Sequence, residues 1–330
     1  MPLSKYLPLG NISPKREFQD KNARKKSRKD AENARKILLI REKSYNPRQK
    51  SNCNLREKNM TVTIIGCLVA MGAFVGFLAG LLGIGGGMIL TPFFTFLLPM
   101  AGISDNVVVH VAIATSLGTI VFTSLSSMRA HHKRGAVLWR VVFSVAPGIL
   151  VGAMMGAKIS SLLPTAVIAF IFALFVGLSA IKMFLDAKPN PARELPGLPG
   201  MFIAGIAIGL VSSFVGAGGG FISVPLMLYC NVKMQNAVGT SAALGFPIAF
   251  FGSIGYIWTG LGVAGLPGWP ETAGFIHVPA LIACACASFL IAPLGAKVAH
   301  SIDTKPLKRI FACNLFLIAA YMLYKAFATL

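Results

Sequence analysis

The feature that most constrains the fold is a glycine cluster that occurs twice inside long apolar runs. The two copies are GLLGIGGGMILTP at 80–92 and SFVGAGGGFISVP at 213–225. Four glycines and a proline occupy matched positions in both copies, 133 residues apart. They are Gly83, Gly85, Gly86, Gly87 and Pro92 in the first copy, and Gly216, Gly218, Gly219, Gly220 and Pro225 in the second. The match indicates an internal duplication.

These clusters predict broken helices. Glycine costs about 1 kcal/mol per helical position relative to alanine, so three in succession favour unwinding. Lipid tolerates unwound backbone only where the backbone is buried in protein or lines an aqueous cavity. Breaks at corresponding positions of two repeats are typical of the substrate site of a membrane transporter.

The composition places the chain in a membrane. Hydrophobic residues make up 55% of it and charged residues 13%, whereas about a quarter of an ordinary soluble domain is charged. Six apolar segments reach the ~20 residues that cross a bilayer, a seventh (138–157) is borderline, and three are shorter. The ten segments are 60–82, 88–99, 107–127, 138–157, 164–185, 200–215, 221–231, 236–259, 274–296 and 307–327. They predict an all-α polytopic protein, multi-pass in the plasma (inner) membrane, with about eight membrane segments.

The duplication extends beyond the glycines. ATSLG at 114–118 matches GTSAALG at 239–245, and GAKIS at 156–160 matches GAKVA at 295–299. We therefore expect four regions: a basic extension (1–59), repeat 1 (60–185), a proline-rich linker (186–199) and repeat 2 (200–330). Each repeat is predicted to be a glycine-broken helix hairpin followed by three transmembrane helices.

Lysine and arginine in short loops predict the orientation. All the basic loops lie on the same side of the membrane if each repeat crosses the membrane an odd number of times. Two repeats that each cross an odd number of times have opposite orientations, so the repeats are inverted. This arrangement places the start of the first helix outside, whereas a basic extension belongs inside. Either the extension is not made, or segment 60–82 crosses fully and the number of crossings differs by one.

The extension has its own alternatives. Residues 1–59 hold 17 Lys and Arg against 6 Asp and Glu and few aromatic residues, which predicts disorder. A segment that binds anionic lipid headgroups fits a membrane protein better than a nucleic-acid tail does, so we expect no nucleic-acid partner. Met60 would also serve as a start, in which case the extension is an over-extended gene model.

The paired G-x-G-G-G-x-x-x-x-P elements (85–92 and 218–225), the Thr-Ser pair of each repeat and the H-H-K-R-G loop at 131–135 resemble the TauE/SafE sulfite exporter family. The resemblance covers about residues 66–328. It implies a transporter of small anions, typically sulfite or organosulfur acids such as sulfonates. Sulfite is the leading candidate, although substrates vary within this family.

The expected site lies between the two breaks. A helix N-terminus carries about half a positive charge and free N–H donors, so it binds an oxyanion without a cationic side chain. Helices that restart after Gly87 and Gly220 provide two such ends, and hydroxyl groups of Thr115, Ser116, Thr240 and Ser241 can add donors. The alternatives are that the glycines only permit close helix packing and that the hydroxyl groups bond their own backbone.

Charged and titratable residues add weaker candidates. Past residue 60 the acidic residues lie in or beside loops, so a carboxylate relay within the membrane is unsupported. Proton coupling would use His110, His277 or the substrate itself, although both histidines also suit an interfacial position. Arg140, Lys158 and Lys297 either attract anions at the mouths of the site or act as membrane anchors.

The sequence offers no support for catalysis. It contains no G-x-S-x-G, H-E-x-x-H or phosphate-loop motif, and the six cysteines have no metal-ligand spacing. We expect no cofactor, no metal and no enzyme activity. The prediction is a secondary transporter that moves a small anion by alternating access. The alternatives are a membrane scaffold or assembly protein that transports nothing, and a carrier of another small organic anion.

Overall fold

The structure, a computed structural model, describes residues 47–83, 85–185, 194–263, 266–268, 270–299 and 305–329. By its contacts the chain divides into two units, Met1–Val62 and Thr63–Leu330. Helix α2 (Pro47–Leu82) begins within the segment that the sequence assigns to the basic extension. Residues 1–46 of that extension and 186–193 of the predicted linker lie outside the described residues.

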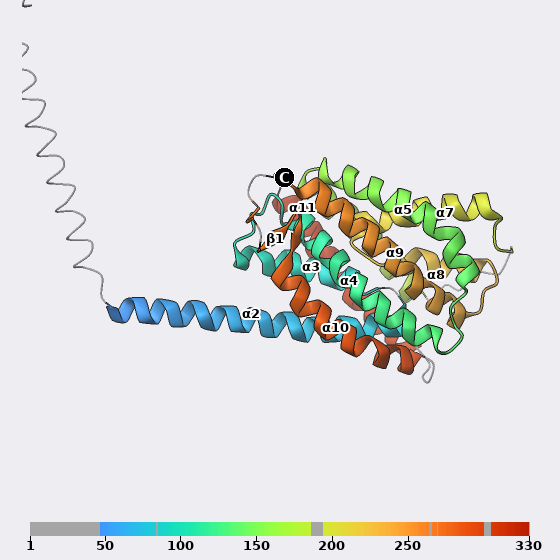
Figure 1. The fold of residues 1–330 in the computed structure, drawn as a ribbon, viewed down its shortest axis with the longest axis horizontal. Coiled ribbons are helices and arrows are strands. Elements are labelled where there is room, and N and C mark those ends of the chain that lie inside the picture. The colour runs from blue at the N-terminus through green and yellow to red at the C-terminus, as the bar shows by residue number, and fades with distance from the viewer. Residues whose placement is uncertain are drawn as a thin grey trace, which may run out of the picture. The chain divides into compact units, whose positions relative to one another are not determined.

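The described chain is almost entirely helical (Figure 1), which confirms the predicted all-α class. Repeat 1 contains α2, α3 (Gly87–Leu97), the 3₁₀ helix η1 (Leu98–Ala101), α4 (Val108–His132), α5 (Trp139–Ser161) and α6 (Thr165–Phe184). Repeat 2 contains α7 (Leu198–Val215), α8 (Gly220–Tyr229), α9 (Met234–Gly260), α10 (Val278–Ala299) and α11 (Lys305–Ala328). Two short strands, β1 (Thr272–Ala273) and β2 (Ile276–His277), pair antiparallel before α10.

Eight of the described helices are long and apolar enough to cross a membrane, which confirms the predicted number of segments. They include Thr63–Leu82 of α2, so this segment can cross fully, as one of the two orientation alternatives requires. They also include α7, which the sequence predicts as a short piece beginning at residue 200. Helix α7 instead begins at Leu198, because a proline in the first turn of a helix loses no intrahelical hydrogen bond. Among the described residues, the shorter apolar helices are Gly87–Ala101, which comprises α3 and η1, and α8.

The first helix of each repeat packs on the third long helix of the other repeat. A Cβ atom built on Gly76 of α2 would lie 2.6 Å from the Cα atom of Ser288 in α10. One built on Gly209 of α7, the position that matches Gly76, would lie 2.6 Å from the carbonyl oxygen of Ile149 in α5. Gly72 and Gly205 form a second matched pair with equally close contacts to α10 and α5. The repeats therefore exchange equivalent contacts, and small residues allow both backbones to approach.

Matched helices of the two repeats also pack on each other, and they do so in opposite directions. Between α4 and α9, Gly252 faces Leu117 while Gly245 faces Ser124. Between α6 and α11, Gly177 faces Ala319, and the rings of Phe184 and Phe316 lie 6.4 Å apart. In both pairs a later residue on one helix contacts an earlier residue on the other, so the matched helices run antiparallel.

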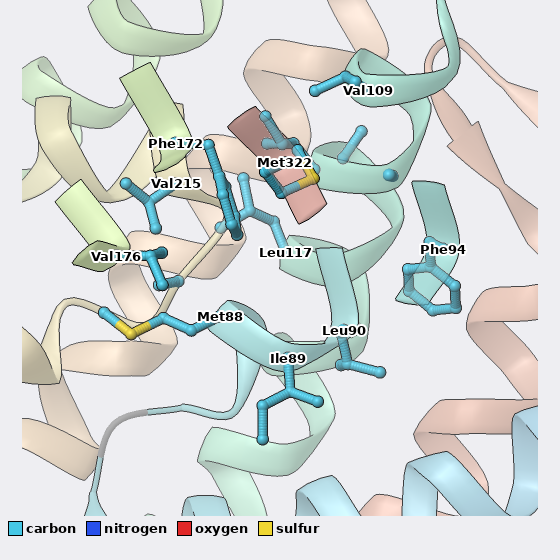
Figure 2. Packing of buried hydrophobic residues seen from close by; sticks show 14 of the residues in the cluster. Met88, Ile89, Leu90, Phe94, Val109, Leu117, Phe172, Val176, Val215 and Met322 are labelled. Carbon is cyan, nitrogen blue, oxygen red and sulfur yellow. The ribbon is translucent and has the colours of Figure 1, made fainter. Parts of the chain in front are cut away.

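The largest buried cluster surrounds the short helix α3. It joins residues of α3, α4, α6, α7 and α11, including Met88, Leu117, Phe172, Val215 and Met322, which Figure 2 shows from close by. Met88, Leu90 and Phe94 of α3 are at most 1% exposed. Most of this short helix is buried and only Phe96 is largely exposed (56%), so its packing fixes the position of the first glycine break.

Candidate functional site

The two breaks share a left-handed backbone conformation at two matched pairs of glycines. Helix α2 ends at Leu82 and α7 ends at Val215, and the next residue, Gly83 or Gly216, has φ of 67° or 61°. Helices α3 and α8 then begin directly after Gly86 and Gly219, whose φ is 73° in both. Only glycine adopts these left-handed conformations without steric cost. The predicted unwinding is therefore present at matched positions of both repeats.

The two breaks lie against each other. A Cβ atom on Gly85 would be 2.8 Å from the Cα atom of Gly218, and one on Gly87 would be 1.9 Å from the carbonyl oxygen of Gly216. No side chain larger than hydrogen fits at either position without a shift of the backbone. The structure thus brings together the glycines of both repeats, as the prediction of a shared site requires.

Two serine hydroxyl groups link the breaks reciprocally. Ser116 of α4 donates to the carbonyl oxygen of Gly216 (3.0 Å), and Ser241 of α9 donates to that of Gly83 (2.9 Å). Both serines are fully buried. Each hydroxyl group therefore satisfies a carbonyl at the end of the other repeat's first helix. Ser223 of α8 donates in turn to Ser241 (2.9 Å).

The threonines that precede these serines, Thr115 and Thr240, do not bond the breaks but contact the starts of other helices. Thr115 accepts a hydrogen bond from the backbone N–H of His277 (3.0 Å), and Thr240 accepts one from that of Leu138 (3.0 Å). His277 and Leu138 directly precede α10 and α5. Of each predicted Thr-Ser pair, the serine contacts a break, whereas the threonine contacts the start of a helix in the other repeat.

The helices that restart at the breaks are uncapped. The N-cap residues of α3 and α8 are Gly86 and Gly219, which have no side chain to cap the helix. The first N–H groups of a helix have no partner within it, and they carry the positive end of the helix dipole. Pro92 and Pro225 lie inside α3 and α8, each five residues after the first helical residue. Two short helices therefore begin at the same place with donors suited to an anion.

The three cationic candidates lie away from the breaks. Arg140 is exposed near the start of α5, and Lys158 and Lys297 are exposed in the last turns of α5 and α10. A cation at the C-terminus of a helix interacts favourably with the helix dipole, which accounts for the two matched lysines without a role in binding. None of the three contributes a side chain to the buried junction of the breaks.

Several buried hydroxyl groups near the second break are absent from the sequence prediction. Ser213 donates to the carbonyl oxygen of Ala153 (3.0 Å), and Tyr256 donates to that of Ser213 (3.0 Å). Ser212 is fully buried beside them. The motif VSSFVG contains both serines, but the matched segment of repeat 1 has none. Comparison of the two copies could not find them, although polar residues in an apolar run were a visible signal.

His277 lies at the start of α10, just outside the membrane-spanning part. Its Nδ1 accepts a hydrogen bond from the backbone N–H of Ala280 (3.3 Å) and so caps the helix. Burial lowers the pKa of His277, and the carboxylate of Glu271 offsets part of this effect. The other candidate histidine, His110, is buried in α4 and bonds the carbonyl oxygen of Ser160 (3.1 Å).

The folded protein should lose stability as His277 becomes protonated. Folding lowers the pKa of His277, so the unfolded chain binds the proton more tightly than the folded chain does. The contribution of His277 to the free energy of unfolding is therefore fully present above the pKa of the unfolded chain, about 6.5, and is lost as the pH falls below it. We expect the melting temperature of the purified protein to fall between pH 7.5 and 5.5, and to fall less in His277→Asn, which can cap without titrating. An equal fall in both proteins would contradict this role.

Comparison with known proteins assigns the family. The family model of the sulfite exporter TauE/SafE matches residues 68–322. A probable membrane transporter protein of Haemophilus influenzae is 34% identical over 267 residues, which cover 81% of this chain and 100% of the relative. Another, from Methanocaldococcus jannaschii, is 26% identical over 78% of this chain and 94% of the relative.

No solved structure matches the chain significantly. The family match, however, covers both glycine breaks, six candidate membrane spans in full and most of the first and last spans. Together with the relatives, it shows that the protein is a multi-pass integral membrane protein of the transporter class. The chain belongs to the sulfite exporter TauE/SafE family.

Proposed function

We propose that this protein is a secondary transporter of a small sulfur-containing anion, sulfite or an organosulfonate, with its substrate site at the junction of the two glycine breaks. One observation carries the proposal: the uncapped starts of α3 and α8, one from each repeat, follow breaks that touch each other. Their N–H groups bind an oxyanion without a buried cation. The choice of a sulfur-containing anion comes from the family.

Alternating access is the mechanism that this arrangement favours. The antiparallel packing of α4 on α9 and of α6 on α11 supports repeats that are inverted across the membrane. Inverted repeats exchange their conformations when one rocks against the other around a fixed site. Because Ser116 and Ser241 each bond the other repeat's break, movement of one repeat changes the environment of the site in both.

A scaffold function is the second candidate. The contacts of 1.9 Å and 2.8 Å that a Cβ atom would make at Gly87 and Gly85 are also those of glycines that serve only to pack two backbones closely. A scaffold needs this junction to stay closed, whereas a transporter needs it to open. Measurement of flux separates the two.

The test is uptake of labelled sulfite by proteoliposomes that contain the purified full-length protein, with sulfate, taurine and sulfoacetate as competitors. Protein-free liposomes serve as the control. Saturable flux above the control is expected, and the competitors rank the related anions. If a folded preparation carries none of these anions, the transport proposal fails for them and the scaffold candidate is favoured.

A further inference from the structure

The two breaks differ in a side chain that lies beside the N-cap of the second short helix. A Cβ atom on Gly219, the N-cap of α8, would lie 3.1 Å from the hydroxyl oxygen of Ser212. A Cβ atom on Gly86, the N-cap of α3, would instead lie 3.4 Å from the methyl carbon of Ala79, the residue that matches Ser212. The pseudo-symmetry therefore fails where the second short helix begins.

The Ser212 hydroxyl group, like those of Ser127 and Ser253, has no hydrogen-bond partner among the described residues, but it is the one that lies beside the start of α8. It is fully buried, and its oxygen contacts neither a donor nor an acceptor. A buried unsatisfied hydroxyl group costs about 1–3 kcal/mol. Ser213, the next residue, shows the usual alternative, since it donates to the carbonyl oxygens of Ala153 and Gly209. Close packing alone does not account for a serine at position 212, because alanine would pack there without the free-energy cost of an unsatisfied hydroxyl group.

The start of α8 and the Ser212 hydroxyl group complement each other as a site for an oxyanion. The first N–H groups of α8 lack side-chain caps, and a serine hydroxyl group adds one donor. The other two atoms nearest to a Cβ atom on Gly219 are methyl carbons of Ile248 (2.5 Å) and Ile208 (3.0 Å). Such apolar walls exclude water, which strengthens hydrogen bonds to an anion. At the start of α3, by contrast, the neighbours are Val75 and Ala79, which offer no side-chain donor.

We propose that Ser212 and the N-terminal N–H groups of α8 form the subsite that binds the oxyanion group of the substrate. In this arrangement repeat 2 supplies the side-chain donor of the shared site, whereas the start of α3 contributes N–H groups without a side-chain donor. The inference rests on the proposed function, since it specifies which half of the junction recognises the charged group. The substrate class is an anion with a sulfite or sulfonate group.

The test compares Ser212→Ala with Ser212→Thr and Ala79→Ser in the flux assay. Loss of one good hydrogen bond to a charged group should raise the KM for sulfite about tenfold, which corresponds to about 1.4 kcal/mol, with little change in maximal rate. Ser212→Thr keeps a hydroxyl group and should retain most of the affinity. Ala79→Ser, the matched change in repeat 1, should not reproduce the loss seen in Ser212→Ala, because the hydroxyl group that binds the oxyanion group comes from repeat 2.

A second readout separates binding from structure. Removal of an unsatisfied hydroxyl group should raise the melting temperature of the ligand-free protein, while sulfite should stabilise Ser212→Ala less than the wild type. A structural role for Ser212 predicts a lower melting temperature instead. An unchanged KM and unchanged stabilisation by sulfite in Ser212→Ala would overturn the subsite.

Failure of the proposed function is distinguishable from failure of the subsite. If the wild type shows no flux, the melting temperature with sulfite, compared with chloride at equal ionic strength, still reports binding. Stabilisation that Ser212→Ala abolishes would support an anion site in a protein that does not transport these anions. No stabilisation of the wild type would overturn both the subsite and the choice of anion.

Discussion

Leucine in place of Gly86 or Gly219 is expected to abolish transport while part of the protein still reaches the membrane. Both glycines have φ of 73°, a conformation that costs other residues about 1–2 kcal/mol. A Cβ atom would also lie 2.3 Å from a methyl carbon of Val75 at Gly86, and 2.5 Å from one of Ile248 at Gly219. The start of each short helix must therefore shift. The initial rate of sulfite uptake, normalised to protein recovered from the membrane, measures the effect.

Gly102→Leu is the matched control for backbone strain. Gly102 has φ of 86° and nothing within 4 Å of a Cβ atom, so leucine there brings similar strain without a clash at the breaks. Its flux should stay within about twofold of the wild type, since surface substitutions usually change stability little. Full activity in both Gly86→Leu and Gly219→Leu would show that the breaks are not the site.

Leucine in place of Gly76 or Gly209 should prevent folding, whereas the variants of Gly86 and Gly219 fold but lose transport. These glycines lie where α2 meets α10 and where α7 meets α5, and a Cβ atom at either position would lie 2.6 Å from backbone atoms. Backbone cannot rotate away as a side chain can, so two long helices would have to separate. Overpacking costs about 1–3 kcal/mol in tolerant cores, and more is expected here. The yield of monodisperse protein in detergent should fall about tenfold or more.

Gly66→Leu is the control for this pair. Gly66 lies in the same helix as Gly76, and a Cβ atom there would meet nothing within 4 Å. It should give a wild-type yield. A wild-type yield from Gly76→Leu and Gly209→Leu would contradict the close packing of the first helix of each repeat on the other repeat.

Much of this architecture follows from the sequence alone. A run of about 20 apolar residues has few alternatives to a membrane helix, and the glycine clusters interrupt those runs at matched positions. Most ends of helices are predicted to within about five residues, since prolines and polar loops mark them, but α2 begins at Pro47 rather than at residue 60. The contact between the two breaks was only a hypothesis in the sequence, because it depends on how helices far apart in the chain pack.

The duplication also limited what the sequence could predict. Comparison of the copies finds residues that both share, such as Ser116 and Ser241, but misses Ser212, whose counterpart is Ala79. It also grouped Thr115 and Thr240 with the serines, although side chains one residue apart on a helix point to different faces. Only the structure shows that these threonines contact the starts of α10 and α5.

The most direct test of a shared site is the stoichiometry of binding. Labelled sulfite is titrated against the purified full-length protein in detergent, beside Gly86→Leu and Gly219→Leu. One site built from both breaks predicts one sulfite bound per chain in the wild type and a large loss of affinity in each variant. Two sulfites per chain, with one lost in each variant, would show separate sites, and no binding by the wild type or unchanged binding in both variants would contradict the account.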